Sequence, residues 1–234
     1  PHRGIETVTY MLKGEFEPNY KSDDRLILAA TDECSIINPS SVYGISKHYQ
    51  ESLVLNVCNA LEISAIALRY QNVYGPGQSL KNPYTGILSI FSTLLLNNQK
   101  INIFEDGLES RDFVHVDDVV TATVLSIESN SNRNEVYNVG TGVPTTVLDI
   151  VKYLMNGYNI KDANYEITGN FRLGDIRHNY ADITKISNDL GFVPKIDVQS
   201  GIETFTNWVK SEGIKKSGDY QGSINELKSR GLFK

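Results

Sequence analysis

Short apolar runs alternate with helix-length amphipathic segments along most of the chain, and this alternation is the feature that most constrains the fold. The clearest run is SAIALR at residues 64–69, which is largely apolar and is bounded by polar residues. A run of this kind is typical of a strand in a parallel sheet that helices cover on both faces. Strands that alternate with helices predict an α/β architecture.

The remaining elements follow from apolar periodicity and from turn-forming residues. Helices are expected over residues 42–61, 86–96, 117–127, 147–155, 183–190 and 202–210. Further strands are expected at residues 101–104, 113–116 and 136–139, with turns at 74–77 and 106–107. Asp117 and Asp118 favour a helix start because acidic groups interact well with a helix N-terminus. Thr145 or Thr146 can cap the helix that follows.

Charge and cysteine content argue against several kinds of partner. The formal net charge is −6, which argues against nucleic acid because phosphate binding favours a basic face. No apolar run approaches the roughly 20 residues that span a bilayer, so no membrane partner is expected. Cys34 and Cys58 form no CxxC pair, and no metal site is predicted. Two free thiols suit a reducing cytoplasm, which is the expected location.

Tyr43 and Lys47, in the stretch YGISK, are the strongest local signal for chemistry. Residues four apart lie one above the other on a helix face. An ammonium beside a phenol favours the phenolate and lowers the phenol pKa from about 10. A phenolate near neutrality can remove a proton from a hydroxyl group. The YxxxK pattern alone is common, and it also fits an ordinary surface helix.

Five further motifs follow Tyr43 in order along the chain. They are QNVYGPG at 71–77, EDG at 105–107, RDFVHVDDV at 111–119, NVGTG at 138–142 and RLGD at 172–175. This ordered series resembles the extended short-chain dehydrogenase/reductase family, specifically its nucleotide-sugar epimerases and dehydratases. The resemblance covers about residues 31–210. Within the family, NPYTG at 82–86 and FEDGL at 104–108 look most like the dTDP-L-rhamnose 4-epimerases.

The resemblance implies a role for each matching residue. Tyr43 would be the catalytic tyrosine, and Lys47 would bond the nicotinamide ribose of the cofactor NAD and lower the tyrosine pKa. Substrate contacts would come from Asn72, Arg111 and Arg172 at the diphosphate, Asn82 at the sugar nucleotide, Ile103 and Phe104 at the pyrimidine base, and Asp175 at the ribose. Arginine suits the diphosphate because its planar fork of donors can make bidentate contacts.

Four other polar residues near these motifs have weaker claims to a role in the reaction. Arg177 and His178 match the family less specifically than Arg172 does. His115 is expected to be a structural histidine with a satisfied hydrogen bond. Asp112 is expected to orient its neighbours rather than to ionise in catalysis.

The resemblance also implies a missing part. The family's nucleotide domain opens with GxxGxxG, which places the cofactor pyrophosphate on a helix N-terminus, and no such motif occurs in this sequence. The chain is therefore expected to lack about the first 130 residues of the family, the usual size of a βαβαβ half. The expected fold is the C-terminal part of a Rossmann-type doubly wound parallel sheet plus a smaller α/β substrate-binding domain.

The expected domain boundaries follow from that fold. The prediction is an irregular insertion or fragment edge at residues 1–30, the remainder of the NAD-binding Rossmann domain at 31–75 with a returning segment near 113–128, and mainly the nucleotide-sugar-binding domain at 76–234.

These features predict an enzyme that epimerises C4 of a nucleoside-diphosphate sugar, with a dTDP-6-deoxyhexose such as dTDP-L-rhamnose favoured. NAD would oxidise the sugar transiently to a 4-keto form. A nucleotide-sugar 4,6-dehydratase and a UDP-glucose/galactose 4-epimerase are alternatives. The dehydratases use an Asp-Glu pair upstream of the tyrosine, and Asp32-Glu33 lies too close to Tyr43 to match it. A truncated, non-catalytic fragment that binds a nucleotide sugar is a further alternative.

The resemblance also implies a homodimer through the Tyr43–Lys47 helix, because members of the family usually dimerise by packing this helix. Leu53, Val54 and Val57 recur at helical spacing and form an apolar face. The same face could instead be buried within the chain.

Overall fold

The computed structural model describes residues 29–39, 41–80, 86–129, 134–171 and 176–212. Three predicted substrate-binding residues, Asn82, Arg172 and Asp175, lie outside these ranges, as does most of the predicted segment 1–30.

Helices and strands alternate along the described residues, as the sequence predicts. The helices are α1 (Val42–Ala60), α2 (Ile87–Leu96), α3 (Val116–Glu128), α4 (Val147–Tyr158), α5 (Thr184–Leu190) and α6 (Val198–Glu212). The strands are β1 (Ile66–Tyr70), β2 (Asn72–Tyr74), β3 (Ile101–Ile103), β4 (Ser110–His115), β5 (Glu135–Val139), β6 (Pro144–Thr146) and β7 (Tyr165–Ile167).

Three small sheets are formed by these strands. β1 pairs with β5 in parallel, and β3 pairs with β7 in parallel. β4 lies between β2, which runs parallel to it, and β6, which runs antiparallel. The chain changes sheets at Gln71, between β1 and β2, where the Gln71 N–H still donates to the Val139 carbonyl at 2.8 Å.

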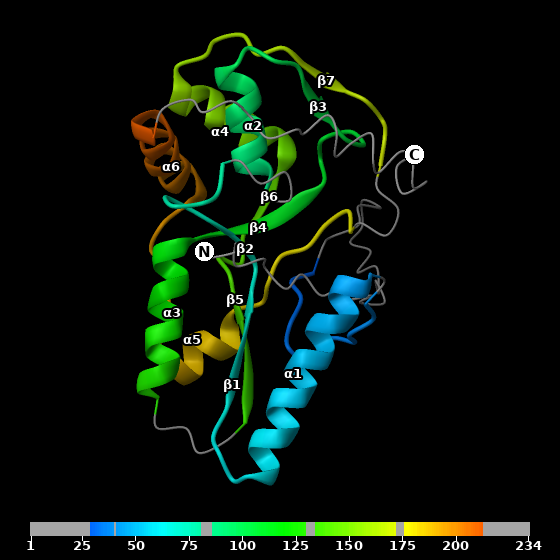
Figure 1. Cartoon of the computed structure of the whole chain (residues 1–234), viewed down its shortest axis with the longest axis vertical. Coiled ribbons are helices and arrows are strands. Elements are labelled where there is room, and N and C mark those ends of the chain that lie inside the picture. Colours follow the sequence, from blue (N-terminus) through cyan, green and yellow to red (C-terminus); the bar gives the residue numbers. More distant parts are fainter. Residues whose placement is uncertain (1–28, 40, 81–85, 130–133, 172–175, 213–234) are drawn as a thin grey trace, which may run out of the picture.

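Helices cover both faces of the β1–β5 sheet (Figure 1). Successive side chains of a strand point to opposite faces, and two neighbours on β1 show this directly. Arg69 forms an ion pair with Glu51 of α1 at 2.8 Å, and the Tyr70 hydroxyl lies 2.9 Å from that of Thr123 on α3. A parallel sheet with helices on both faces is the arrangement expected of a doubly wound fold.

Two hydrophobic cores lie one above the other in Figure 1. The lower core packs β1 and β5 against α3 and α5 and includes Val139, Ile186 and Phe192. The upper core packs α2, α4 and α6 around β3 and includes Leu154 and Phe205. β2 and β4 contribute side chains to both cores. The predicted domain boundaries stay a prediction, since packing alone does not define them.

The outer face of α1 is apolar and exposed. Leu53, Val54 and Val57 are each about half exposed, as are Ile45 and Tyr49 earlier in the helix. No helix among the described residues combines the length and the apolar character needed to cross a bilayer.

Candidate functional site

Tyr43 and Lys47 lie on one face of α1, as their spacing predicts. Ser41 caps the helix, with its Oγ accepting from the Gly44 N–H at 3.0 Å. Tyr43 is therefore in the first turn, and the Lys47 Nζ lies 5.5 Å from the centroid of its ring. Both side chains are half-buried. The structure thus brings an ammonium and a phenol together at a face that a ligand can reach.

Arg111 is held in place by backbone carbonyls at the start of β4. Its Nη1 donates to the Ser110 and Arg177 carbonyls, both at 2.9 Å. In the register of β2 with β4, Asn72 is paired with Phe113. Arg111 lies two positions before Phe113, so the alternation of side chains places Asn72 and Arg111 on the same sheet face.

The two residues expected at a nucleotide base differ in exposure. Ile103, at the end of β3, is completely buried in the upper core, and its carbonyl accepts from the Thr168 N–H at 2.9 Å. This placement does not support the expected contact of its side chain with a base, because the upper core encloses it. Phe104 is half-buried in the turn that follows.

Asp112 is a buried organiser of the loop after β5. Its carboxylate accepts from the Thr141 N–H at 2.8 Å, the Thr141 hydroxyl at 2.7 Å and the Gly142 N–H at 2.9 Å. Burial raises the pKa of Asp112, and these hydrogen bonds oppose the rise. A Cβ on Gly140 would lie 2.4 Å from the Asp112 carboxylate, so that position requires glycine. The contacts fit the orienting role that the sequence suggests.

His115 is buried at the junction of β4 and α3. Its Nδ1 accepts from the Asp117 N–H at 3.3 Å and caps α3, and its ring packs edge-on against Tyr74. Its Nε2 has no hydrogen-bond partner among the described residues. Burial lowers the pKa of His115. A neutral, capping imidazole agrees with the structural role expected, although only one of the two ring nitrogens is satisfied.

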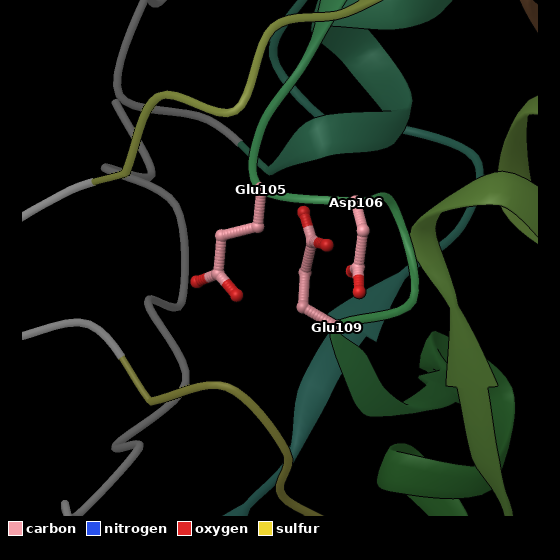
Figure 2. A group of neighbouring side chains, drawn as sticks. All are labelled: Glu105, Asp106 and Glu109. Atoms are coloured by element: carbon pink, nitrogen blue, oxygen red, sulfur yellow. The ribbon is translucent and has the colours of Figure 1, made fainter.

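Three carboxylates gather in the loop between β3 and β4, and the sequence analysis missed this cluster. Figure 2 shows the Glu109 side chain between those of Glu105 and Asp106, with ligand atoms within 4.8 Å of one another. Burial raises the pKa of Glu109, and its two acidic neighbours raise it further. The available signal was three acidic residues within five positions.

Arg177 supplies positive charge to this cluster. Its guanidinium forms ion pairs with Glu105 and Asp106, and it holds the pKa of Asp106 below its usual value. Three such carboxylates could in other surroundings bind a divalent cation. In this structure the Arg177 guanidinium already pairs with two of the carboxylates and supplies the positive charge that a cation would bring. Glu105, Asp106 and Arg177 line a pocket of about 480 Å³ together with Gly169 and Phe171.

Similar proteins of known structure share this fold. The UDP-glucose 4-epimerase of Thermotoga maritima, solved with UDP-glucose, aligns with a TM-score of 0.71 and 34% identity over 80% of this chain and 59% of its own. The UDP-glucuronic acid 4-epimerase of Bacillus cereus, solved with UDP-glucuronic acid and NAD, gives a TM-score of 0.72 and 29% identity over 80% and 58%. The predicted Rossmann-type α/β fold is thus confirmed.

Residues 20–140 match the family described as the NAD dependent epimerase/dehydratase family, and the chain belongs to it. The family's cofactor is NAD, as the sequence predicts. A dTDP-L-rhamnose 4-epimerase of Burkholderia thailandensis is 36% identical over 179 residues, covering 76% of this chain and 49% of its own length. A UDP-glucose 4-epimerase of Mycolicibacterium smegmatis is 32% identical over 172 residues, covering 74% and 54%. The chain therefore spans about half the length of these relatives.

Proposed function

We propose that this chain is the catalytic and substrate-binding part of an NAD-dependent nucleotide-sugar 4-epimerase. The observation that carries the proposal is the Lys47 ammonium 5.5 Å from the Tyr43 ring on one helix face. An ammonium in this place favours the phenolate that proton removal requires. The similarity to a dTDP-L-rhamnose 4-epimerase supports a dTDP-6-deoxyhexose as the favoured substrate.

The proposed chemistry assigns each group one task. Tyr43 would remove the proton from the sugar 4-hydroxyl, and Lys47 would stabilise the phenolate and bond the cofactor ribose. When bound, NAD would supply the hydride transfer from C4 of the sugar and back to the opposite face. Arg111 and Asn72 would hold the diphosphate, with Arg111 offering donors from a fixed guanidinium. Further contacts from Asn82, Phe104, Arg172 and Asp175 stay predictions.

Among the described residues, Tyr43 and Lys47 suit the nicotinamide ribose of NAD. The phenol of Tyr43 and the ammonium of Lys47 are half-buried hydrogen-bonding groups that suit ribose hydroxyls. The pyrophosphate needs a glycine-rich turn at a helix N-terminus, and the sequence holds no GxxGxxG. Binding of the NAD pyrophosphate would therefore need residues like those in the half of the relatives' length that this chain does not match.

Replacing Tyr43 with Phe in the full-length protein tests the assignment. The variant keeps the ring and loses the hydroxyl, so we expect kcat for 4-epimerisation to fall roughly 10²–10⁴-fold, the usual contribution of a general acid–base group. The dissociation constant for dTDP is expected to stay unchanged because the diphosphate contacts are intact. Turnover is measured by chromatography of the sugar nucleotides, and binding by calorimetry.

Tyr49→Phe is the matched control, since Tyr49 is an exposed tyrosine on the same helix and its variant should keep normal turnover. Normal epimerisation by Tyr43→Phe would remove Tyr43 from its role. Formation of a 4-keto-6-deoxy sugar by the wild type would favour the dehydratase alternative. Binding of dTDP without any turnover would favour the binding-fragment alternative.

The exposed apolar face of α1 supports a proposed homodimer. Leu53, Val54 and Val57 are each about half exposed on one helix, and contiguous apolar surface of this kind is common at protein–protein interfaces.

A further inference from the structure

Arg177 links two separate walls of the pocket described above. One wall is the turn after β3, which contains Glu105 and Asp106, and the other is the segment before α5, which contains Arg177. The ion pairs between them join residues 72 and 71 positions apart. Glu105 has a φ of 46°, a left-handed conformation that costs a non-glycine residue free energy. The ion pair with Arg177 therefore stabilises a turn in which the backbone conformation of Glu105 is unfavourable by itself.

The same segment also positions the proposed diphosphate ligand Arg111. The Arg177 carbonyl accepts from the Arg111 Nη1 at 2.9 Å. Arg111 also lies close enough to Glu109 to lower the pKa of that carboxyl. Arg177 thus connects the two groups, since its backbone holds Arg111 and its side chain pairs with Glu105 and Asp106.

This arrangement creates an electrostatic problem for an anionic ligand. Three carboxylates whose ligand atoms lie within 4.8 Å of one another would repel a diphosphate bound at Arg111. Glu105 is partly buried, whereas Asp106 and Arg177 are exposed, so the repulsion depends on the ionic strength of the solvent. Arg177 is bonded to two of the three carboxylates. Its charge offsets theirs where the ligand would bind.

We propose that Arg177 is a positioning residue for a nucleoside diphosphate: it neutralises Glu105 and Asp106 and so allows the neighbouring site at Arg111 to accept the diphosphate group. The inference rests on the proposed function. Arg177 does not itself contact the phosphates in this scheme, because its guanidinium is committed to the two carboxylates.

Arg177→Gln tests the inference with two probes, dTDP and thymidine, that differ by the charged diphosphate group. We expect the full-length variant to bind dTDP about tenfold more weakly than wild type at low ionic strength, and the difference to shrink at high salt because ions screen the repulsion. Binding of uncharged thymidine is expected to stay unchanged. Calorimetry measures dTDP binding, and ligand-observed NMR measures thymidine.

A rescue variant separates electrostatics from folding. Adding Glu105→Gln and Asp106→Asn to Arg177→Gln removes the two carboxylates that lost their partner, and we expect dTDP affinity to return to within about twofold of wild type, because Glu109 alone remains, as it does beside the neutralised pair in wild type. Lys161→Gln controls for net charge, since Lys161 is an exposed lysine outside the pocket lining, and it should bind dTDP normally.

Three results would overturn the inference. Wild-type affinity for dTDP in Arg177→Gln would show that the guanidinium has no such role. Loss of thymidine binding together with dTDP binding, without rescue, would show that Arg177 only maintains the pocket's structure. If the wild type bound neither probe, the proposed function would fail and this inference with it.

Discussion

Burial sets the protonation state of His115, which caps α3 with one ring nitrogen. The side chain is 2% exposed, and burial lowers its pKa below the usual value of about 6.5. Asp117 and Asp118 oppose this shift, and the effect of burial is larger. The native state therefore contains a neutral imidazole in conditions where the unfolded chain begins to bind a proton.

Stability should consequently fall on the acid side of neutrality. The unfolded state binds more protons than the native state below about pH 6.5, so the unfolding free energy decreases as pH falls from there toward the lowered native pKa, by at most about 1.4 kcal/mol per pH unit for one group. We expect His115→Asn, which keeps a capping acceptor, to have a shallower pH dependence than wild type. Urea unfolding from pH 5 to 8 measures both.

His178 could contribute to the same pH dependence, because burial, Arg177 and Arg111 lower its pKa as well. A His178→Asn variant is therefore the control. The His178→Asn variant should keep the His115 contribution to the slope. If His115→Asn retained the full wild-type slope, burial of His115 could not be the cause.

At the scale of elements, α4 begins with a reciprocal side-chain cap. The Thr146 Oγ1 accepts from the Asp149 N–H at 3.1 Å and donates to the Asp149 carboxylate at 2.6 Å. The Thr146 hydroxyl and Lys152 hold the pKa of Asp149 low. The sequence left Thr145 and Thr146 as equal candidates. Both threonines pair with β4 in the structure, Thr145 with Arg111 and Thr146 with Ser110. Thr146 is the cap because its hydroxyl is the one that accepts from the Asp149 N–H.

Thr146→Ala should destabilise the protein by about 1 kcal/mol, the usual cost of losing an N-cap side chain. Part of the capping contribution requires ionised Asp149, so it is present above the normal carboxyl pKa and is lost as pH falls through the lowered value. The difference between wild type and variant should therefore shrink in acid. Chemical denaturation at pH 7 and pH 3 measures it. Thr146→Ser keeps the hydroxyl, and a large loss in that variant would argue against the cap.

At the scale of the whole molecule, Asp118 connects the two cores. It lies in α3, which packs in the lower core, and its buried carboxylate accepts from the Lys195 and Ile196 N–H groups, both at 3.0 Å. Those residues lead into α6, which packs in the upper core. The contact thus joins elements about 80 positions apart.

Asp118→Ala should cost about 3 kcal/mol, because two partly buried N–H groups would lose their acceptor. Asp117→Ala removes the same charge from the exposed neighbouring residue and should cost much less. Denaturation followed by circular dichroism and by the fluorescence of Trp208, the single tryptophan, measures both. Equal losses in the two variants would show that charge at the start of α3, and not the connection, is responsible.

Longer elements were more predictable than short ones. The six described helices agree with the expected ranges to within a few residues, because apolar spacing over about two or more turns is a strong local signal. β2, β6 and β7 were not expected. Each has three residues, too few to show a period, and each pairs with a strand distant in the sequence. β3 is equally short, but it was expected because the Asp106-Gly107 turn follows its apolar residues.

The site divides in the same way. Tyr43 and Lys47 could be paired from the sequence because 3.6 residues per turn place positions four apart on one helix face, whatever the rest of the chain does. The joining of Arg177 to Glu105, 72 positions away, and the complete burial of Ile103 depend on which strands pair and which faces pack. The spacing of residues within one segment does not indicate such long-range contacts, because they form only when folding brings distant segments together.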